Sequence, residues 1–507
     1  MDIAKQLDGV FRLEPEAEAL EFEKRWITWG ELTRVIDSIN GILDAAGIGE
    51  DEGVAMLLRN RPPHYAAIVA MLISRRCIVT VNPMQPREKY LAELESLRTR
   101  AIIADREDWA HPGVAELADR LGSVAISLDA IGHDCVQTLP GRDRLGDGPF
   151  HEPFTGVAIQ MLTSGTTGTP KRIPLRRRTL EKALEDAMVY EKDRSPDDPP
   201  KLRSGVTIQQ MPFVHISGIF GVAGNALAGR KGVLLERFSV EGWHDAVKRH
   251  RPKVASAVPT ALRMILDADI PKEDLSSLIA LRSGTAPLPP ELADEVMARY
   301  GIPVLGNYGA TEFAGGVAGW SYKDFKAHWE TKRGSVGRVH DGIDARVVHP
   351  ESFEELPTGE AGLLELRGGQ IEDGKTWVRT NDLARLDEDR FLYILGRADN
   401  AIIRGGFKII PGDVADVLES HPAVKEAAVV GLDDRRLGQV PVAAFELAPG
   451  AEAPTDDELA EWIRSRMTAY SVPVAFKAVD ELPRTPSLKV SAVGVKELFG
   501  DLEQAGA

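Results

Sequence analysis

The chain alternates short apolar strands with amphipathic helices, and this order constrains the fold more than any other feature of the sequence. Residues 54–58 and 77–81 have apolar strand patterns, and a helix pattern over 65–74 lies between them. The strand pattern returns further along the chain, over 205–211, 231–235, 254–257 and 303–305. A helix between two strands carries the chain back to the edge where the first strand began, so that the strands can pair in parallel. This order predicts an α/β fold in which parallel or mixed sheets are covered by helices.

Two capping boxes indicate where helices begin. Thr28 and Glu31 have the spacing of a capping box, and Gly47 is placed to end the helix that they open. The apolar residues of this helix recur every three or four positions and share one face: Leu32, Val35, Ile36, Ile39, Ile42 and Leu43. Thr455 and Glu458 have the same capping spacing near the C-terminus. The helix after them turns its apolar residues inward: Leu459, Trp462, Ile463 and Met467.

Length and a change of pattern predict more than one domain. At roughly 150 residues per domain, a chain of 507 residues is long enough for several domains. The last part of the chain differs from the rest, with strand patterns over 427–431 and 440–447. We place the boundary just after Gly396. The prediction is a large N-terminal domain over 1–396 and a small α+β C-terminal domain over 397–507.

Charge and cysteine content exclude several classes of protein. The chain has 61 Lys and Arg against 77 Asp and Glu, a formal net charge of −16. A surface of that average sign repels nucleic acid and anionic membranes, so a phosphate-bearing ligand needs a local cationic site. Cys77 and Cys135 are the only cysteines, too few for a disulfide framework or a cysteine-ligated metal cluster. We find no apolar run that could span a membrane and no signal-peptide pattern over 1–12, so we expect a cytoplasmic protein. The sequence does not indicate an oligomeric state.

The strongest local motif is residues 161–171, which read MLTSGTTGTPK. Gly165 and Gly168 permit backbone angles that turn successive N–H groups toward one anion, and Lys171 adds a positive charge. Hydroxyl groups add further donors: Thr163, Ser164, Thr166 and Thr167. This combination suits a polyphosphate, although its spacing is not that of a Walker A loop. By composition alone, a flexible polar loop between two strands is an equally good interpretation.

A second motif follows the short strand pattern over 303–305. Residues 307–312 read NYGATE, in which Tyr308 can stack on a base and Thr311 can donate to a phosphate. Glu312 offers the hard oxygen ligand that Mg²⁺ prefers. Taken alone, the motif is also compatible with an ordinary turn that carries an exposed acid.

Three charged residues toward the C-terminus complete the set of candidates. Asp382 can accept hydrogen bonds from the two hydroxyls of a ribose, and Arg397 can add a donor. Lys489 lies in the segment LPRTPSLK, where two prolines favour an exposed loop. A surface ion pair and a solvated lysine are the plain structural interpretations of these residues.

In their order along the chain, these motifs resemble the adenylate-forming superfamily, which includes acyl-CoA synthetases, the adenylation domains of peptide synthetases and luciferases. The resemblance covers nearly the whole chain. It rests on the segments 19–22, 28–32, 58–60, 162–171, 212–215, 258–260, 283–288, 307–312, 380–382, 396–399 and 483–489. It implies an ATP- and Mg²⁺-dependent ligase that activates a small carboxylic acid as an acyl-adenylate, releases pyrophosphate and passes the acyl group to an acceptor such as CoA.

The resemblance also implies roles for individual residues in binding ATP. The β- and γ-phosphates would be held by the Ser/Thr-rich loop: Thr163, Ser164, Gly165, Thr166, Thr167, Gly168 and Lys171. Thr285, Ala286 and Pro287 would flank the adenine, against which Tyr308 would stack. The neighbouring residues Asn307, Gly309 and Ala310 belong to the same nucleotide-binding segment. Thr311 would contact the α-phosphate, Glu312 would bind Mg²⁺, and Asp382 and Arg397 would bind the ribose.

Catalysis and the acid site follow from the same resemblance. Lys489 would assist adenylation together with His215, Thr311 and Glu312, and Asp399 would be the hinge about which the C-terminal domain rotates. The acid would lie among His215, Gly218, Gly284, Gly309, Gly315 and Gly316. The small residues here predict space for an acid larger than acetate: an aryl, polycyclic or medium-chain acid. Residues 213–218 contain no acidic residue to pair with an ammonium, which disfavours an amino acid.

The sequence departs from the family pattern at four places. Asn381 stands where Gly is usual. Arg172 and the arginines at 176–178 follow the phosphate loop, where they either add positive potential near the phosphates or form the solvated start of a helix. Residues 412–415 lack the usual acidic pattern, and Leu488 replaces the glycine before Lys489. The last two leave open a ligase that passes the acyl group to an amine and forms an amide. A catalytically inactive nucleotide- or acyl-binding regulator is a remote alternative, because such proteins usually lack the lysine or the Mg²⁺ ligand.

Overall fold

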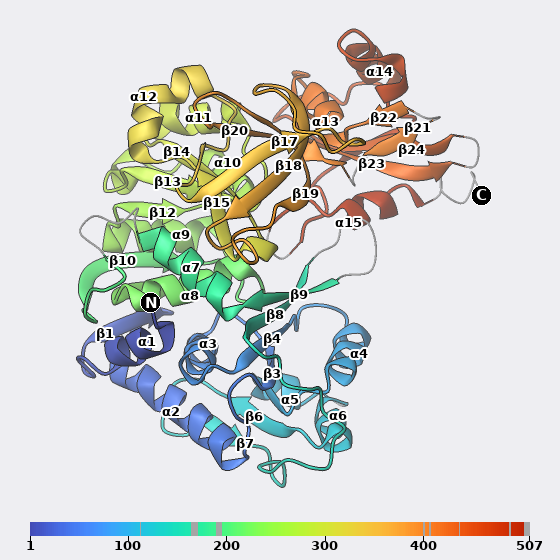
Figure 1. Cartoon of the computed structure of the whole chain (residues 1–507). Coiled ribbons are helices and arrows are strands. Elements are labelled where there is room, and N and C mark those ends of the chain that lie inside the picture. The colour runs from blue at the N-terminus through green and yellow to red at the C-terminus, as the bar shows by residue number, and fades with distance from the viewer. Residues whose placement is uncertain are drawn as a thin grey trace.

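A computed structural model describes residues 1–111, 113–163, 171–188, 195–398, 401–404, 407–434, 437–485 and 488–500. In Figure 1 the blue-to-yellow elements form a large body, and the orange and red elements from β21 onward lie together at one side of it. Within the described ranges, no helix combines the length and apolar character that crossing a bilayer requires.

The first large sheet has the predicted strand–helix–strand order. Its strands lie in the order β7-β6-β5-β3-β4-β8-β9, with β7 and β9 antiparallel at the edges and the others parallel. The strands are β3 Gly53–Leu57, β4 Cys77–Val81, β5 Ala101–Asp105, β6 Val124–Leu128, β7 Val136–Thr138, β8 Val157–Thr163 and β9 Lys171–Arg176. The helices of this region are α2 Trp29–Ala45, α3 Pro62–Ser74, α4 Arg87–Leu97, α5 Arg106–Trp109 and α6 Val114–Leu121. Residues 62–72 of α3 are all buried, because this helix lies between the sheet and other helices.

Two further sheets carry most of the candidate site. One has the order β10-β11-β1-β2 and the other β12-β13-β14-β15-β16. Their strands are β1 Glu18–Phe22, β2 Arg25–Thr28, β10 Arg203–Gln209, β11 Arg230–Leu234, β12 Val254–Ser256, β13 Ala280–Ser283, β14 Val304–Ala310, β15 Gly315–Gly319 and β16 Arg338–Val339. The helices are α1 Ile3–Phe11, α7 Arg177–Met188, α8 Ile216–Leu227, α9 Val240–His250, α10 Pro259–Asp267, α11 Pro290–Tyr300 and α12 Tyr322–Lys332, with short 3-10 helices η1 Lys272–Leu275 and η2 Thr311–Phe313.

An antiparallel sheet follows in the chain and leads to the C-terminal region. Strands β17 Ile343–Val348, β18 Ala361–Gly368, β19 Val378–Leu386 and β20 Leu392–Arg397 pair in sequence order. β20 ends at Arg397 and β21 begins at Ile402, so the boundary that we predict after Gly396 lies at the end of β20. The division into two domains at that point stays a prediction.

We call the elements from β21 onward the C-terminal region. Its sheet has the order β22-β21-β24-β23, with β25 beside β24. The elements are β21 Ile402–Arg404, β22 Phe407–Ile409, β23 Val424–Asp434, β24 Gly438–Leu447, β25 Phe476–Val479, α13 Pro411–Glu419, α14 Asp456–Arg464, α15 Ala492–Glu497 and the 3-10 helix η4 Ala469–Ser471. This region has its own buried clusters, one of which contains Val414, Leu418, Phe445 and Ile463.

The α/β prediction and both capping boxes are confirmed. The Thr28 hydroxyl accepts from the Glu31 N–H at the start of α2, and Thr455 does the same with Glu458 at the start of α14. The strand predicted over 303–305 is too short, because β14 continues to Ala310. Its second half pairs antiparallel with β15, so most of the NYGATE motif lies in a strand and not in a turn.

The arginines after the phosphate loop fall into two groups. A solvated helix start holds for Arg176 and Arg178, which are exposed where α7 begins, but Arg172 and Arg177 are held in ion pairs. The Arg172 side chain is mostly buried, forms an ion pair with Glu93 and donates to the carbonyl oxygens of Thr80 and Gln160. Arg177 forms an ion pair with Asp51 at 2.7 Å. Both guanidinium groups therefore join elements of the first sheet and are not available as free positive charge.

Candidate active site

The candidate residues meet where β13 ends beside the middle of β14. These strands are parallel, and Ser283 pairs with Gly306, so the segment after β13 lies against the second half of β14. The contact is close: a Cβ atom on Gly284 would lie 2.1 Å from Oδ1 of Asn307. The sequence motifs over 283–288 and 307–312, separated in the chain, are therefore neighbours in the fold.

Thr285 has an unusual backbone in this segment. Its φ is +70°, in the left-handed region that a β-branched residue rarely adopts. Such strain is retained where the surrounding structure imposes it, and it is concentrated at binding and catalytic sites. The neighbouring Ser283 Oγ is buried and has no hydrogen-bond partner among the described residues. Both observations point to a segment that is shaped for a ligand.

Tyr308, Asp382 and Arg397 form one connected set from three strands. The Tyr308 hydroxyl donates a hydrogen bond to the Asp382 carboxylate. Asp382 on β19 lies directly opposite Arg397 on β20 in the antiparallel register. Burial, followed by the charge of Asp382, raises the pKa of Tyr308 above its usual range, so the hydroxyl keeps its proton. The set presents an aromatic ring, a carboxylate and a guanidinium at one place, as the ribose hypothesis requires.

Gly309 permits the turn of the chain toward Thr311 and Glu312. A Cβ atom there would lie 2.2 Å from the carbonyl oxygen of Gly315, so only glycine allows β14 and β15 to approach this closely. The pairing register shifts between Tyr308 and Gly309, as at a β-bulge. Glu312 is exposed in η2, directly after the strand.

The helix η2, which carries Glu312, contacts the strand that follows the Ser/Thr-rich motif. That strand is β9, and its first residue Lys171 pairs with Thr163 at the end of β8. The two described residues that flank the motif are therefore neighbours, and one of them is on the strand that η2 contacts. Five of the motif's predicted phosphate-binding residues lie outside the described residues: Ser164, Gly165, Thr166, Thr167 and Gly168. The predicted hinge residue Asp399 also lies outside them.

Lys489 lies near His215 and Arg397, at the candidate site. The positive charge of Lys489 acts on His215, and that of Arg397 acts on Lys489. The lysine is exposed to solvent, although part of its side chain is buried against neighbouring residues. This burial, followed by the charge of Arg397, lowers the pKa of Lys489 below its usual range. The C-terminal region is thus docked with its loop lysine directed toward the candidate site.

His215 precedes α8 and is uncharged at neutral pH. Burial, followed by the charge of Lys489, lowers the pKa of His215 to about 4. Its Nε2 atom is buried without a hydrogen-bond partner in the described part of the chain. A buried polar atom without a partner costs stability. A ligand that bonded to it would remove that cost.

Asn60 is a positioning residue to which sequence reasoning gave no role. Its side-chain amide donates to the carbonyl oxygens of Met211 and Leu235, and its Oδ1 accepts from the Phe213 N–H. These bonds fix the segment that leads to His215. Residues 58–60 were part of the family resemblance, but no local pattern connects Asn60 with a segment about 150 positions away.

The small residues predicted to leave space for the acid fall into two groups. At Gly218, an added Cβ would lie 2.2 Å from the Pro212 carbonyl oxygen, so Gly218, like Gly284 and Gly309, permits close packing within the protein. At Gly221 an added Cβ would meet nothing within 4 Å. At Gly315 it would lie 3.4 Å from the Phe220 ring. Open space is therefore found on the α8 side. The argument that small residues leave space for a large acid does not apply to Gly218, Gly284 and Gly309.

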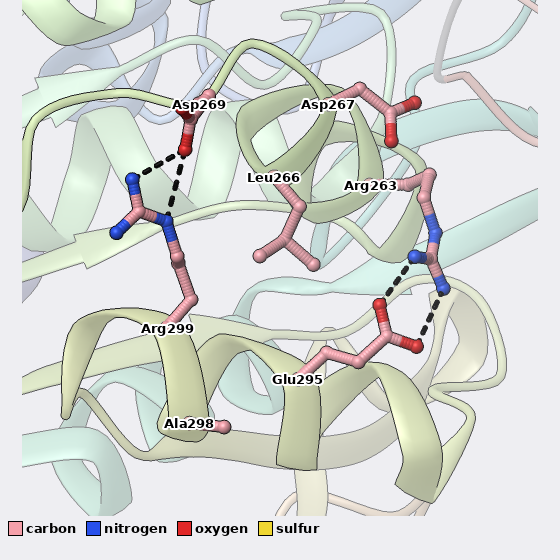
Figure 2. A pocket seen from close by; sticks show the side chains of 7 residues that line it. All are labelled: Arg263, Leu266, Asp267, Asp269, Glu295, Ala298 and Arg299. Atoms are coloured by element: carbon pink, nitrogen blue, oxygen red, sulfur yellow. Dashed lines mark hydrogen bonds and ion pairs between the residues drawn. The ribbon is translucent and has the colours of Figure 1, made fainter. Parts of the chain in front are cut away.

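A hollow between α10 and α11 is separate from this site. Figure 2 shows that its charged residues pair with one another, Arg263 with Glu295 and Arg299 with Asp269, while Asp267 joins neither pair. Because the two arginines are already neutralised, the hollow offers no free positive charge to a phosphate. Asp267 instead forms an ion pair with Lys425 of the C-terminal region at 3.1 Å, so this face belongs to the contact between the two parts of the chain.

Comparison with known proteins agrees with this geometry. The chain matches the family of AMP-binding enzymes over residues 8–374 and the AMP-binding enzyme C-terminal domain over residues 413–489. It is 29% identical over 469 residues to 4-coumarate–CoA ligase 3 of Oryza sativa subsp. japonica, which covers 88% of this chain and 82% of that protein. It is 28% identical over 501 residues to 2-succinylbenzoate–CoA ligase of Bacillus subtilis, with 94% of each chain covered.

A solved structure extends the likeness to three dimensions. The amide bond synthetase McbA from Marinactinospora thermotolerans superposes with a TM-score of 0.79 at 25% identity, covering 98% of this chain and 99% of that one. The two family matches together include most of the chain, and they contain His215, Tyr308 and Lys489 of the candidate site. The chain is therefore a member of the adenylate-forming superfamily of AMP-binding enzymes.

Proposed function

We propose that the protein joins an aryl-bearing carboxylic acid to CoA, by way of an acyl-adenylate. The observation that supports this most is the meeting of groups from distant parts of the chain at one site: the Tyr308–Asp382–Arg397 set, neutral His215 and the loop lysine Lys489. A ribose, an acid and a phosphate need these kinds of partner, and family membership makes the chain an ATP-dependent adenylate-forming ligase.

The first half-reaction needs positioning more than proton transfer. A carboxylate oxygen attacks the α-phosphorus of ATP, an acyl O–P bond forms, and the P–O bond to pyrophosphate breaks. The acid is already ionised at neutral pH, so no protein base is required. The protein must hold two anions together and stabilise the negative charge that grows on the phosphate oxygens. We assign that stabilisation to the Lys489 ammonium and the Thr311 hydroxyl.

Glu312 fits a Mg²⁺ ion that is bound mainly by the nucleotide. The described residues contain no group of three or more His, Cys, Asp or Glu side chains that could form a metal site of their own. Mg²⁺ commonly takes one or two protein carboxylates, with phosphate oxygens and water as its remaining ligands. A single exposed carboxylate in η2, which contacts the strand after the Ser/Thr-rich motif, meets this requirement. When bound, the ion would neutralise part of the charge on the phosphates.

We assign His215 to the acid. Because its pKa is about 4, the ring is neutral at physiological pH and can donate one hydrogen bond to a carboxylate oxygen without a competing charge. Beside it, the open side of Gly221 and the ring of Phe220 offer an apolar surface on which an aromatic acid can pack. The two curated relatives are named for 4-coumarate and 2-succinylbenzoate, which both carry an aromatic ring.

CoA is the acceptor that we favour, since both of those relatives are CoA ligases. In this step the CoA sulfur attacks the acyl carbonyl, a C–S bond forms, AMP leaves and the thiol proton passes to solvent. An amine acceptor is the second candidate, supported by the likeness to the amide bond synthetase and by Leu488 beside the loop lysine. In that case the amine nitrogen attacks the acyl carbonyl, a C–N bond forms, the acyl C–O bond to AMP breaks, and the amine proton passes to solvent.

Mass spectrometry can decide among these outcomes. The purified protein is incubated with ATP, Mg²⁺ and a panel of acids that includes 4-coumarate, ferulate, benzoate, 2-succinylbenzoate, octanoate and acetate. Each acid is tested without an acceptor, with CoA and with a set of primary amines. We expect an acyl-adenylate without an acceptor and a thioester with CoA for the aryl acids. A preference for acetate would contradict the assignment of the acid, and an amide with no thioester would contradict the assignment of CoA.

A further inference from the structure

Leu488 occupies a backbone conformation that ordinarily belongs to glycine. Its φ is +63°, in the left-handed region, where a leucine is strained. Leu488 directly precedes Lys489, and it thus carries a bulky side chain at a backbone position that favours glycine. Strain of this kind persists only when other contacts hold the residue in place.

One hydrogen bond ties the backbone of Leu488 to Thr260 across the boundary between the two parts of the chain, and a second ties Arg484 to the same hydroxyl. The hydroxyl of Thr260, on α10, donates to the Leu488 carbonyl oxygen at 3.0 Å. That hydroxyl in turn accepts from Nη1 of Arg484 at 3.1 Å. Arg484 is itself fixed within the C-terminal region by an ion pair with Glu426 at 2.6 Å. The loop is therefore attached to α10 through one hydroxyl.

The Leu488 side chain makes a second attachment to the same surface. It packs against the buried cluster that includes Val258, Leu262 and Leu281, all of which belong to the large N-terminal body. Leu488 is half-buried there, although it comes from the C-terminal region. A glycine would keep the backbone bond to Thr260 and lose this apolar contact.

Hydrogen bonds within the loop connect the attached residue Leu488 to Lys489. The Leu488 N–H donates to the Thr485 carbonyl oxygen, and the Thr485 N–H donates to the Lys489 carbonyl oxygen, each at 2.8 Å. These bonds make the turn around Leu488 tight, so fixing Leu488 on α10 fixes the point from which the lysine side chain extends toward His215. Anything that must enter the space of Lys489 has to detach this loop first.

We infer that Leu488 is a positioning residue that clamps the loop of Lys489 onto α10 through Thr260 and the adjoining apolar cluster. It favours the arrangement in which the lysine reaches the candidate site, and it opposes the withdrawal of the loop. The inference rests on the proposed function for its effect on catalysis, but the clamp itself is a property of the folded chain. It explains why a strained leucine is kept where glycine would be unstrained.

The clamp can be measured without any substrate. Asp267 and Lys425 form an ion pair across the same boundary, so the double substitution Asp267→Cys and Lys425→Cys places a thiol on each side. A short bifunctional maleimide then links them when the parts are docked. Cys77 and Cys135 are buried, and burial raises the pKa of these thiols to about 12 and about 11, so they react little. Leu488→Ala in this background should lower the initial rate of crosslinking about fivefold, as the loss of a half-buried leucine contact implies.

Thr260→Val tests the clamp from the other side and should lower the rate in the same direction. The matched control is Val493→Ala, an aliphatic residue of the C-terminal region that is 67% exposed and so should leave crosslinking unchanged. Unchanged crosslinking in both Leu488→Ala and Thr260→Val would overturn the inference. This result would stand apart from a failure of the proposed function, because no acid or acceptor is present.

The catalytic consequence has its own test, with the natural cysteine content restored. Leu488→Ala should slow pyrophosphate release about fivefold, in line with its crosslinking. Transfer from a supplied acyl-adenylate, such as 4-coumaroyl-AMP, should stay the same or become faster. A residue with a merely structural role would slow both steps together, and equal losses in the two steps would contradict the positioning role. Melting temperatures of all variants distinguish a loosened loop from a destabilised fold.

Discussion

Replacement of Lys489 by methionine tests the centre of the proposed chemistry. Methionine keeps the length and the apolar stem of the side chain and removes only the ammonium. In this structure burial and the charge of Arg397 lower the pKa of Lys489, so its surroundings are less polar than bulk water and a charge interacts more strongly there. At an effective dielectric constant of about 20, two unit charges about 4 Å apart interact by about 4 kcal/mol. Removal of one well-placed donor from a catalytic site has an effect of similar size, about 3–4 kcal/mol.

These magnitudes predict the loss of rate. A barrier higher by about 3–4 kcal/mol slows acyl-adenylate formation between about a hundredfold and a thousandfold. The assay is pyrophosphate release with ATP, Mg²⁺ and the acid that reacts fastest in the panel. Lys477→Met is the matched control, because Lys477 is an exposed lysine of the same region whose ammonium contacts only the carbonyl oxygen of Leu498 among the described interactions. Near wild-type release by Lys489→Met would refute the reasoning.

A pH profile adds a second criterion. Burial and the charge of Arg397 lower the pKa of Lys489, so the lysine should lose its proton at a pH below the usual 10.5 for this residue. The kcat/KM of the wild-type protein for ATP, which reports the pKa of the ATP-free enzyme, should therefore decline as the pH rises through that lowered value. Lys489→Met should lack this decline, because its remaining activity has no ammonium to lose. The same alkaline decline in both proteins would mean that another group is responsible.

Three further predictions follow from the site. Tyr308→Phe keeps the ring and removes the hydroxyl that donates to Asp382. Because hydrogen bonds to charged groups contribute about 1.5–3 kcal/mol, the KM for ATP should rise about tenfold or more, with a smaller change in kcat. An unchanged KM would contradict the role of this pair in binding ATP. Glu312→Gln should raise the Mg²⁺ concentration needed for half-maximal pyrophosphate release, without changing the melting temperature, and a Mg²⁺ titration that coincides with wild type would exclude Glu312 as a ligand. The pKa of His215 is about 4 in the folded protein and 6.5 in the free residue, so folding favours the neutral ring. The resulting contribution to stability is present above pH 6.5 and is lost as the pH falls toward 4, by about 3 kcal/mol at most. The melting temperature of His215→Gln should therefore depend less on pH over this range than that of wild type.

Local chemistry explains which parts of the fold could be predicted from sequence. The helices that begin after Thr28 and Thr455 depend on hydrogen bonds within four residues, so their capping boxes could be read directly. The extent of β14 could not, because its second half depends on pairing with β15 and on the close approach of Gly309 to Gly315. A segment that combines Gly, Asn and Thr looks like a turn until its partner strand is known.

The same distinction applies to the site. Residue types and spacing indicated Tyr308, Asp382 and Arg397, and the fold brings these three together. The contact of Thr260 with Leu488 joins residues 228 positions apart, and no periodicity or motif connects them. Leu488 was visible in the sequence only as a departure from a family pattern, and its physical meaning required its backbone angle and its packing.

The charges at the candidate site show how a protein with a net charge of −16 can receive a triphosphate. The long-range field of such a surface opposes the approach of ATP, so affinity must come from a few cations placed at short range. Lys489 and Arg397 are held close enough for the charge of Arg397 to lower the pKa of the lysine, which makes the docked arrangement electrostatically unfavourable before ATP arrives. A bound triphosphate would reverse this effect and raise the pKa of Lys489 again. Nucleotide and docked loop should therefore stabilise one another: ATP relieves the repulsion between the cations, and the clamp at Leu488 keeps the lysine in place until ATP binds.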